Sequence, residues 1–132
     1  MRLRLYCKLI RQDVATANGR VYSREALARI AALSNQQSLE NRCLLAADVP
    51  PDASTLKLAD VVANVENCTL FDGGLHIDVC MLDTEKGKPL KALSAPLVEK
   101  AFSVVPIMFG TTPNGMNVDP YSITFKGWSL VR

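Results

Sequence analysis

A long β-hairpin in the middle of the chain constrains the fold more than any other feature. Two stretches with alternating apolar and polar residues, about Leu56 to Leu70 and Leu75 to Leu82, flank the sequence Asp72-Gly73-Gly74. Period-two alternation indicates strands with one buried face, and glycines supply the positive φ that a tight tip requires. The other segments must therefore cover the apolar face of this hairpin.

Four more strands are expected around the hairpin. Residues Arg2 to Ile10 alternate strictly, which predicts a half-buried strand with a basic outer face that guards a sheet edge. The short apolar run Cys43 to Ala47 predicts a buried strand, which Pro50 and Pro51 end because proline cannot donate to a ladder. The last two predicted strands are a central strand at Ala101 to Phe109, with a bulge or early exit at Pro106, and a strand at Tyr121 to Val131, with a bulge at Gly127.

Two helices complete the expected fold. Ser23 has the chemistry of an N-cap, and apolar residues at helical spacing predict a helix over about Ser23 to Ser34, followed by a loop over Asn35 to Asn41. Thr84 could cap a short helix that runs to about Leu93. The sequence therefore predicts an α+β fold in a single domain, 1–132: a small, mostly antiparallel β-sheet or barrel with one or two flanking helices.

Composition excludes several functional classes. The 132 residues are 48% hydrophobic and 21% charged, as in ordinary soluble domains, and the net charge of +2 gives no argument for specific nucleic-acid binding. The longest apolar runs are far shorter than the roughly 20 residues that a membrane helix needs, and no signal peptide is expected. Four widely spaced cysteines and one histidine favour reduced, buried thiols over a zinc site, and no cofactor is expected.

Several short motifs occur in an order that is typical of one family. The chain contains Asn18-Gly19-Arg20-Val21-Tyr22, then Leu44 to Pro50 before the hairpin, then Asp83-Thr84-Glu85-Lys86-Gly87-Lys88, then a strand with a serine. This order resembles the maturation (prohead) proteases of tailed phages, whose pattern runs N-G-R-x-Y, a helix, G-E-L-x-H-P, a second histidine, a hairpin, D-T-x-x-G-K and a serine strand. The resemblance implies a serine-protease fold related to the herpesvirus assemblins.

The chain departs from this family at the catalytic positions. The first family histidine is matched by Val49, the glutamate of the same motif by Ala46, and the second histidine by about Ala63. A serine nucleophile needs a general base within hydrogen-bond reach, and valine and alanine cannot accept a proton.

The serine strand of the family, G-V-S-S-R-G, is matched by residues 101–106 of this chain. Ser103 then corresponds either to the nucleophile or to its neighbour, and Pro106 lacks the N–H that an oxyanion donor would need. In the terminal G-x-D-x-V segment, Ser129 replaces the acid. His76 is better explained as an imidazole on an outer strand face, and Asp48 as a turn former, than as substitute bases.

We therefore predict a catalytically degenerate member of the family that is not an enzyme, with vestigial catalytic positions at Val49, Ala63 and Ser103. Its expected role is that of a non-catalytic virion structural protein, an auxiliary capsid or decoration (cement) protein that stabilises the capsid. The candidate interface residues, whose alternatives are a solvated strand face and plain core, are Arg2, Arg4, Lys8, Ile107, Met108 and Phe109.

The expected partners are the major capsid protein and further copies of the chain, without a membrane or a specific nucleic acid. The expected location is the virion, after synthesis in the host cytoplasm. Two alternatives remain open at this stage. One is an active maturation protease that uses Ser103, alone or with a base from a partner. The other is a capsid assembly factor that is absent from the mature virion.

Overall fold

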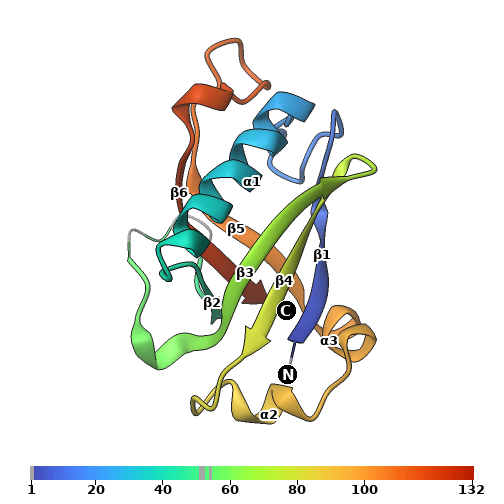
Figure 1. Ribbon diagram of the computed structural model, residues 1–132. Coiled ribbons are helices and arrows are strands. Elements are labelled where there is room, and N and C mark those ends of the chain that lie inside the picture. The colour runs from blue at the N-terminus through green and yellow to red at the C-terminus, as the bar shows by residue number, and fades with distance from the viewer. Residues whose placement is uncertain (1, 51–52, 54) are drawn as a thin grey trace.

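A curled, six-stranded sheet forms the centre of the molecule (Figure 1). The computed structural model describes residues 2–50, 53 and 55–132. The strands are β1 (Arg2–Arg11), β2 (Leu44–Ala47), β3 (Val61–Phe71), β4 (Gly74–Met81), β5 (Ser103–Phe109) and β6 (Thr124–Val131). They lie in the order β1-β4-β3-β2-β6-β5, and only β2 and β6 are parallel neighbours among these strands. The predicted α+β class and mostly antiparallel sheet are confirmed.

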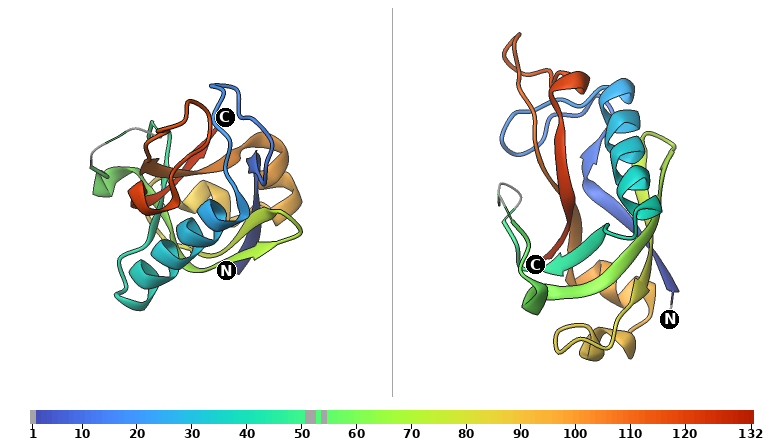
Figure 2. Two further views of the ribbon diagram at one scale, coloured as in Figure 1. Left: turned by 90° about the horizontal axis from the view of Figure 1, so that it is seen from above. Right: turned by 60° about the vertical axis from the view of Figure 1, so that its left-hand side comes forward.

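Three α-helices accompany the sheet: α1 (Arg24–Leu39), α2 (Lys88–Lys91) and α3 (Ala95–Ala101), with 3₁₀ turns η1 (Leu58–Asp60) and η2 (Pro120–Ser122). The buried side of α1 packs against the inner face of the curled sheet (Figures 1 and 2). Below the sheet, α2 and α3 replace the single helix predicted from Thr84 to Leu93, because Thr84 forms a turn with Gly87 instead of capping a long helix. No helix in the described residues is both long and apolar enough to span a bilayer.

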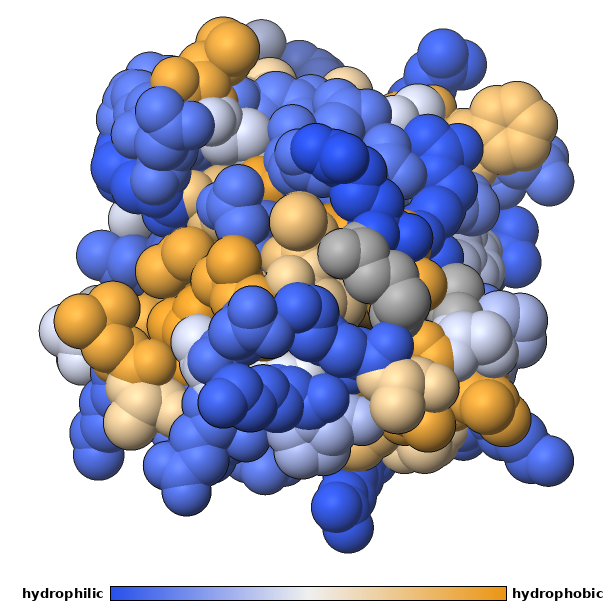
Figure 3. Space-filling model, turned by 60° about the horizontal axis from the view of Figure 1, so that its bottom comes forward, coloured by the Kyte–Doolittle hydropathy of each residue, from blue (hydrophilic) through white to orange (hydrophobic). Residues whose placement is uncertain are grey.

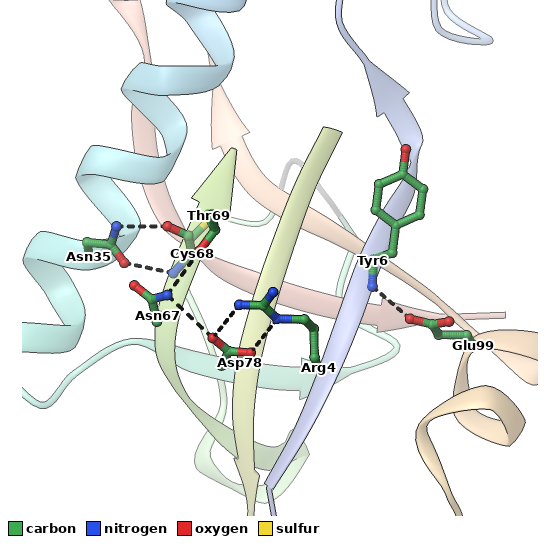
Figure 4. Close-up of polar contacts among 8 residues, drawn as sticks. All are labelled: Arg4, Tyr6, Asn35, Asn67, Cys68, Thr69, Asp78 and Glu99. Carbon is green, nitrogen blue, oxygen red and sulfur yellow. Dashed lines mark hydrogen bonds and ion pairs between the residues drawn. The ribbon is translucent and has the colours of Figure 1, made fainter. Parts of the chain in front are cut away.

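Helix α1 begins as predicted and ends later. The hydroxyl of Ser23 accepts a hydrogen bond of 3.1 Å from the N–H of Ala26, as an N-cap does. The predicted end at Ser34 is wrong, because polar residues of the next turns bind the sheet. Asn35 exchanges hydrogen bonds of 2.9 and 2.7 Å with the backbone of Cys68 in β3 (Figure 4), and Ser38 donates to the carbonyl of Val65.

The central hairpin is confirmed, although its first strand is shorter than predicted. The tip has Asp72 at φ 51° and Gly73 at φ 73°, and the burial of β4 alternates along its length. Strand β3 begins at Val61 rather than near Leu56, because η1 occupies the preceding residues. The predicted strand-breaking pair Pro50-Pro51 follows β2, but Pro51 lies outside the described residues.

Both edge strands differ from the prediction. The pairing of β1 with β4 shifts register after Cys7, so Leu9, predicted to face inward, is 53% exposed and Ile10 is buried instead. Strand β5, predicted to be central, lies at the other edge of the sheet. An edge position tolerates Pro106, because the missing N–H needs no ladder partner there. The predicted bulge at Gly127 is confirmed by the register shift between β5 and β6.

The core combines one face of the sheet with α1. Trp128 is fully buried at its centre, and its indole N–H donates a 2.9 Å hydrogen bond to the hydroxyl of Ser34. All four cysteines are free thiols, and only Cys80 is partly exposed. At the end of the molecule that carries α2 and α3, hydrophobic patches are separated by hydrophilic residues (Figure 3).

Candidate functional site

The positions that the family resemblance connects with catalysis meet on the outer face of the sheet. In β2 and β6, Ala46 lies beside Ser129, and Ser129 in turn lies beside Val105 of β5. Their neighbours Leu45 and Leu130 face the core, so these three residues project to the opposite face because strand side chains alternate. They form a row across three strands, which we call the outer row.

A short segment after β2 covers the outer row. Val49 joins Ala46 and Ile107 in a small buried cluster, with Leu56 packed against it. Ser129 is fully buried, and its hydroxyl donates a hydrogen bond of 2.6 Å to the carbonyl oxygen of Val49. The positions matched to the family glutamate, first histidine and acid therefore do lie together, and here they form an apolar contact around one paired hydroxyl.

Asp48 shapes the turn that brings Val49 over the row. Its φ is 58°, a left-handed conformation that aspartate tolerates better than most residues, and its N–H donates a 2.9 Å hydrogen bond to the carbonyl of Leu130. This geometry agrees with the turn-forming role expected from the sequence.

Ala63, matched to the second histidine by the sequence pattern, faces away from the outer row. Ala63 pairs with Leu45 and is fully buried in the main core, on the face opposite to Val49. A register shift between Leu45 and Ala46 places Val61, not Ala63, directly beside Ala46. Val61 therefore extends the outer row onto a fourth strand. The sequence alone gives no sign of this shift, because it arises in the pairing of β2 with β3.

Ser103 lies near the outer row without being part of it. It is the half-buried first residue of β5 and pairs with Val131. This pair lies two residues along the strands from the pair of Val105 and Ser129. Because residues two apart share a face of a strand, its hydroxyl belongs to the same face as Val105. The structure thus brings Val49 and Ser103 to the same face of the sheet and leaves Ala63 on the other.

His76 lies elsewhere, on β4. Strand β3 separates β4 from β2, so the imidazole is remote from the outer row. It packs between two aromatic rings, with centroid distances of 4.6 Å to Tyr6 and 6.1 Å to Phe71. In the described part of the chain, no group of three histidine, cysteine or carboxylate side chains is arranged to hold a metal ion.

The D-T-x-x-G-K motif fixes the turn after β4 against the sheet. The hydroxyl of Thr84 donates a 2.6 Å hydrogen bond to the carbonyl of Val61 and accepts one of 3.0 Å from the N–H of Gly87. A Cβ at Gly87 would lie 2.8 Å from the carbonyl oxygen of Val62, so only glycine fits. In this chain the motif has a structural role next to one end of the outer row.

The N-G-R-x-Y motif holds the loop after β1 against the end of β5. Gly19 has a φ of 80°, and the guanidinium of Arg20 donates a 3.2 Å hydrogen bond to the carbonyl of Gly110. Tyr22 is buried, and burial raises the pKa of its hydroxyl. The loop forms one wall of an open cleft of about 480 Å³ between β1 and β5.

The candidate interface residues separate into three groups. Met108 and Phe109 line the cleft, whereas Ile107 is fully buried and cannot contribute to a surface, which corrects that prediction. On β1, the basic side chains have partners: Arg2 pairs with Glu66, Arg4 pairs with Asp78, and Lys8 donates to the carbonyl of Glu99. Figure 4 shows the Arg4 pair, and this hydrogen-bonded guanidinium lowers the pKa of Asp78.

Comparison with known proteins gives one informative likeness. The chain matches no family model and no curated protein sequence. Among solved structures it is similar to the capsid assembly protease of bacteriophage T4, with a TM-score of 0.72 over 99% of this chain and 81% of that one. The chain has a prohead-protease-like fold. At 16% sequence identity, the likeness shows this fold and nothing finer.

The prohead-protease-like fold corrects one prediction. The sequence predicted that the chain is not an enzyme, and the likeness contradicts this, because the matched structure is that of a protease. The prediction that the family's catalytic positions are degenerate is untested by the likeness and stays a prediction.

Proposed function

We propose that this protein is an auxiliary capsid protein of a tailed bacteriophage, which binds the shell built by the major capsid protein. The observation that carries the proposal is the likeness of nearly the whole chain to a protein of capsid assembly. A prohead-protease-like fold in such a virus must recognise shell or scaffold subunits. The same surfaces can hold the chain on the finished shell.

Repetition on the capsid lattice makes weak docking sufficient. A protein that bridges neighbouring shell subunits gains a second contact at high effective concentration once the first has formed. The open cleft between β1 and β5, with Met108 and Phe109 in its wall, offers apolar surface for such contacts. The added interface would stabilise a shell under internal pressure.

The composition of purified particles tests this proposal. Mature capsids should contain the chain in many copies, in a fixed ratio to the major capsid protein, as measured by quantitative mass spectrometry. Mature shells that lack the chain should disassemble at a lower temperature than mature shells that contain it. Presence in precursor shells combined with absence from mature particles would instead identify an assembly factor and contradict the proposal.

A second candidate function is maturation proteolysis, which the fold favours. Ser103 is the candidate nucleophile, since it lies on the same face as the outer row at the start of β5. Its hydroxyl oxygen would attack the substrate carbonyl while a base takes the hydroxyl proton. The base would then give that proton to the leaving amine, and water would hydrolyse the acyl-enzyme. A partner chain would supply that base.

A cleavage assay distinguishes the second candidate from a purely structural role. The purified chain is incubated with capsid and scaffold precursors, beside Ser103→Ala and a matched Ser94→Ala variant. Ser94 is an exposed residue whose side chain caps no backbone N–H. Cleavage that survives Ser94→Ala and disappears with Ser103→Ala supports the protease. Absence of cleavage, or cleavage that Ser103→Ala leaves intact, excludes this nucleophile.

A further inference from the structure

The two free edges of the sheet face each other and are covered at one end only. Strands β1 and β5 are the outermost strands, and the curl of the sheet brings them together (Figure 2). Near α3, the carboxylate of Glu99 accepts a 2.9 Å hydrogen bond from the backbone N–H of Tyr6 on the edge of β1 (Figure 4). Leu5, Val98 and Val104 are buried around this contact. The helix therefore closes the gap between the edges at this end.

At the opposite end the edges separate, and the cleft opens between them. Its walls come from Leu9 and Ile10 of β1 and from residues 105–109 of β5, with the loop at 16–22 along one side. Leu9 and Phe109 are 53% and 47% exposed, although both are large and apolar. A volume of about 480 Å³ lies in the range of sites that hold a ligand or a short peptide.

The lining of the cleft is basic where it is charged. Arg20 is the charged residue among those that line it, and no carboxylate belongs to the described lining. The guanidinium donates to the carbonyl of Gly110 and also interacts with the hydroxyl of Tyr22, which fixes its position. Five N–H donors on the group leave others for a ligand. An occupant with both apolar side chains and a carboxylate would complement this surface.

We propose that the cleft between β1 and β5 binds an extended, apolar peptide segment that carries an acidic residue and belongs to a subunit of the capsid shell. The segment would lie along the edge of β5 that opens into the cleft and pair with its backbone, as in β-strand addition, with its carboxylate on Arg20. The proposal rests on the proposed function for the source of the segment. It adds the docking surface and the kind of partner.

A second copy of the chain is the competing occupant. Pro106 interrupts the row of N–H donors in β5, which disfavours edge-to-edge pairing of two identical chains over a long stretch. A short segment from another protein needs only a few backbone hydrogen bonds and can accommodate this interruption. Sedimentation of the chain alone distinguishes the two: a dimer that Phe109→Glu dissociates would overturn the proposal.

Peptide binding with matched variants provides the main test. Overlapping peptides of about ten residues, the length of a long strand, cover the shell subunit and are titrated against the folded chain by fluorescence anisotropy. A peptide with apolar residues and an acid should bind, and Phe109→Glu should weaken its binding about tenfold or more. Phe71→Glu is the matched control, because Phe71 is 67% exposed at the hairpin tip, away from the cleft.

Three further measurements keep the proposal falsifiable. Leu9→Glu in the cleft and Leu39→Glu at the end of α1, where Leu39 is 86% exposed, form a second matched pair in case one variant misfolds. N-methylation of alternate peptide amides should abolish binding if strand edges are used. Replacement of the peptide acid, or Arg20→Gln, should weaken it. Equal binding by cleft and control variants, or binding by no peptide, would overturn the proposal.

Failure of the cleft proposal can be distinguished from failure of the proposed capsid role. Co-sedimentation of the full chain with purified shells measures the proposed function directly. If the chain binds shells and Phe109→Glu binds equally well, the cleft proposal fails and the capsid role stands. If the cleft binds a shell peptide but the chain does not sediment with shells, the cleft is supported and the capsid role fails.

Discussion

The hydroxyl of Ser129 donates a 2.6 Å hydrogen bond to the carbonyl oxygen of Val49, and Ser129 is fully buried. This bond joins β6 to the segment that covers the outer row. Ser129→Ala should lower the free energy of unfolding by about 1–3 kcal/mol, because it leaves a buried carbonyl without a donor. Urea denaturation measures the change, and Ser94→Ala, at an exposed position, serves as control. Equal stability of the two variants would contradict a structural role for the bond.

Glu99 protects the free edge of β1. Because its carboxylate accepts the hydrogen bond from the Tyr6 N–H, Glu99→Ala should speed hydrogen exchange of that amide about tenfold or more, which NMR measures residue by residue. Glu99→Gln keeps an acceptor oxygen and should preserve most of the protection. Unchanged exchange in Glu99→Ala would show that another group covers this edge.

Burial of two thiols makes the fold sensitive to alkali. Burial raises the pKa of Cys7 to about 11 and that of Cys68 to about 12. An unfolded thiol ionises near pH 8.5. Above about pH 8.5 the unfolded chain therefore loses protons that the folded chain retains, and the free energy of unfolding should fall by up to about 1.4 kcal/mol per pH unit for each thiol.

Stability curves between pH 8 and 10.5 check this dependence. Cys68→Val keeps an apolar side chain of similar size and should make the free energy of unfolding fall less steeply with pH. Substitution of the half-buried Cys80 should leave the contribution of Cys7 and Cys68 to this fall unchanged. A decline that is equally steep in Cys68→Val would assign it to other groups.

The turn at Gly87 should reject any side chain. Its φ of −80° suits all residues, so the constraint is steric: a Cβ would meet the backbone carbonyls of Leu82 and Val62. Gly87→Ala should cost about 3 kcal/mol, the upper end of the usual range for overpacking. Gly115→Ala, at φ 97° with open space around the new methyl, should cost only about 1 kcal/mol of backbone strain. Calorimetric melting of both variants compares the two losses.

Sequence reasoning succeeded where the deciding chemistry is local. The hairpin was predictable because its tip needs positive φ at residues that the sequence supplies, and the start of α1 because Ser23 can cap Ala26. It failed where side chains bind remote backbone. The end of α1 depends on Asn35, whose side-chain amide forms hydrogen bonds with the backbone of Cys68, far along the sequence in β3.

The candidate site shows the same division. The matches of Ala46, Val49 and Ser129 gave positions that the structure does bring together. The sequence contains no sign that Ala63 faces the core, because a register shift places Val61 beside Ala46, and such shifts are decided by pairing between strands. The edge position of β5 was equally hidden, since an apolar run looks the same in a central strand and in an edge strand that the rest of the fold buries.

The two interrupted edges described above also bear on how the chain behaves at high concentration. On the edge of β1, the N–H of Tyr6 is already bonded to Glu99, and on the edge of β5, Pro106 has no N–H. Uniform, open edges are the templates on which fibrils grow, so an interruption on each edge disfavours polymerisation of the chain. Removal of both blocks, by Glu99→Ala together with Pro106→Val, is therefore the change most apt to convert this fold into an aggregating one.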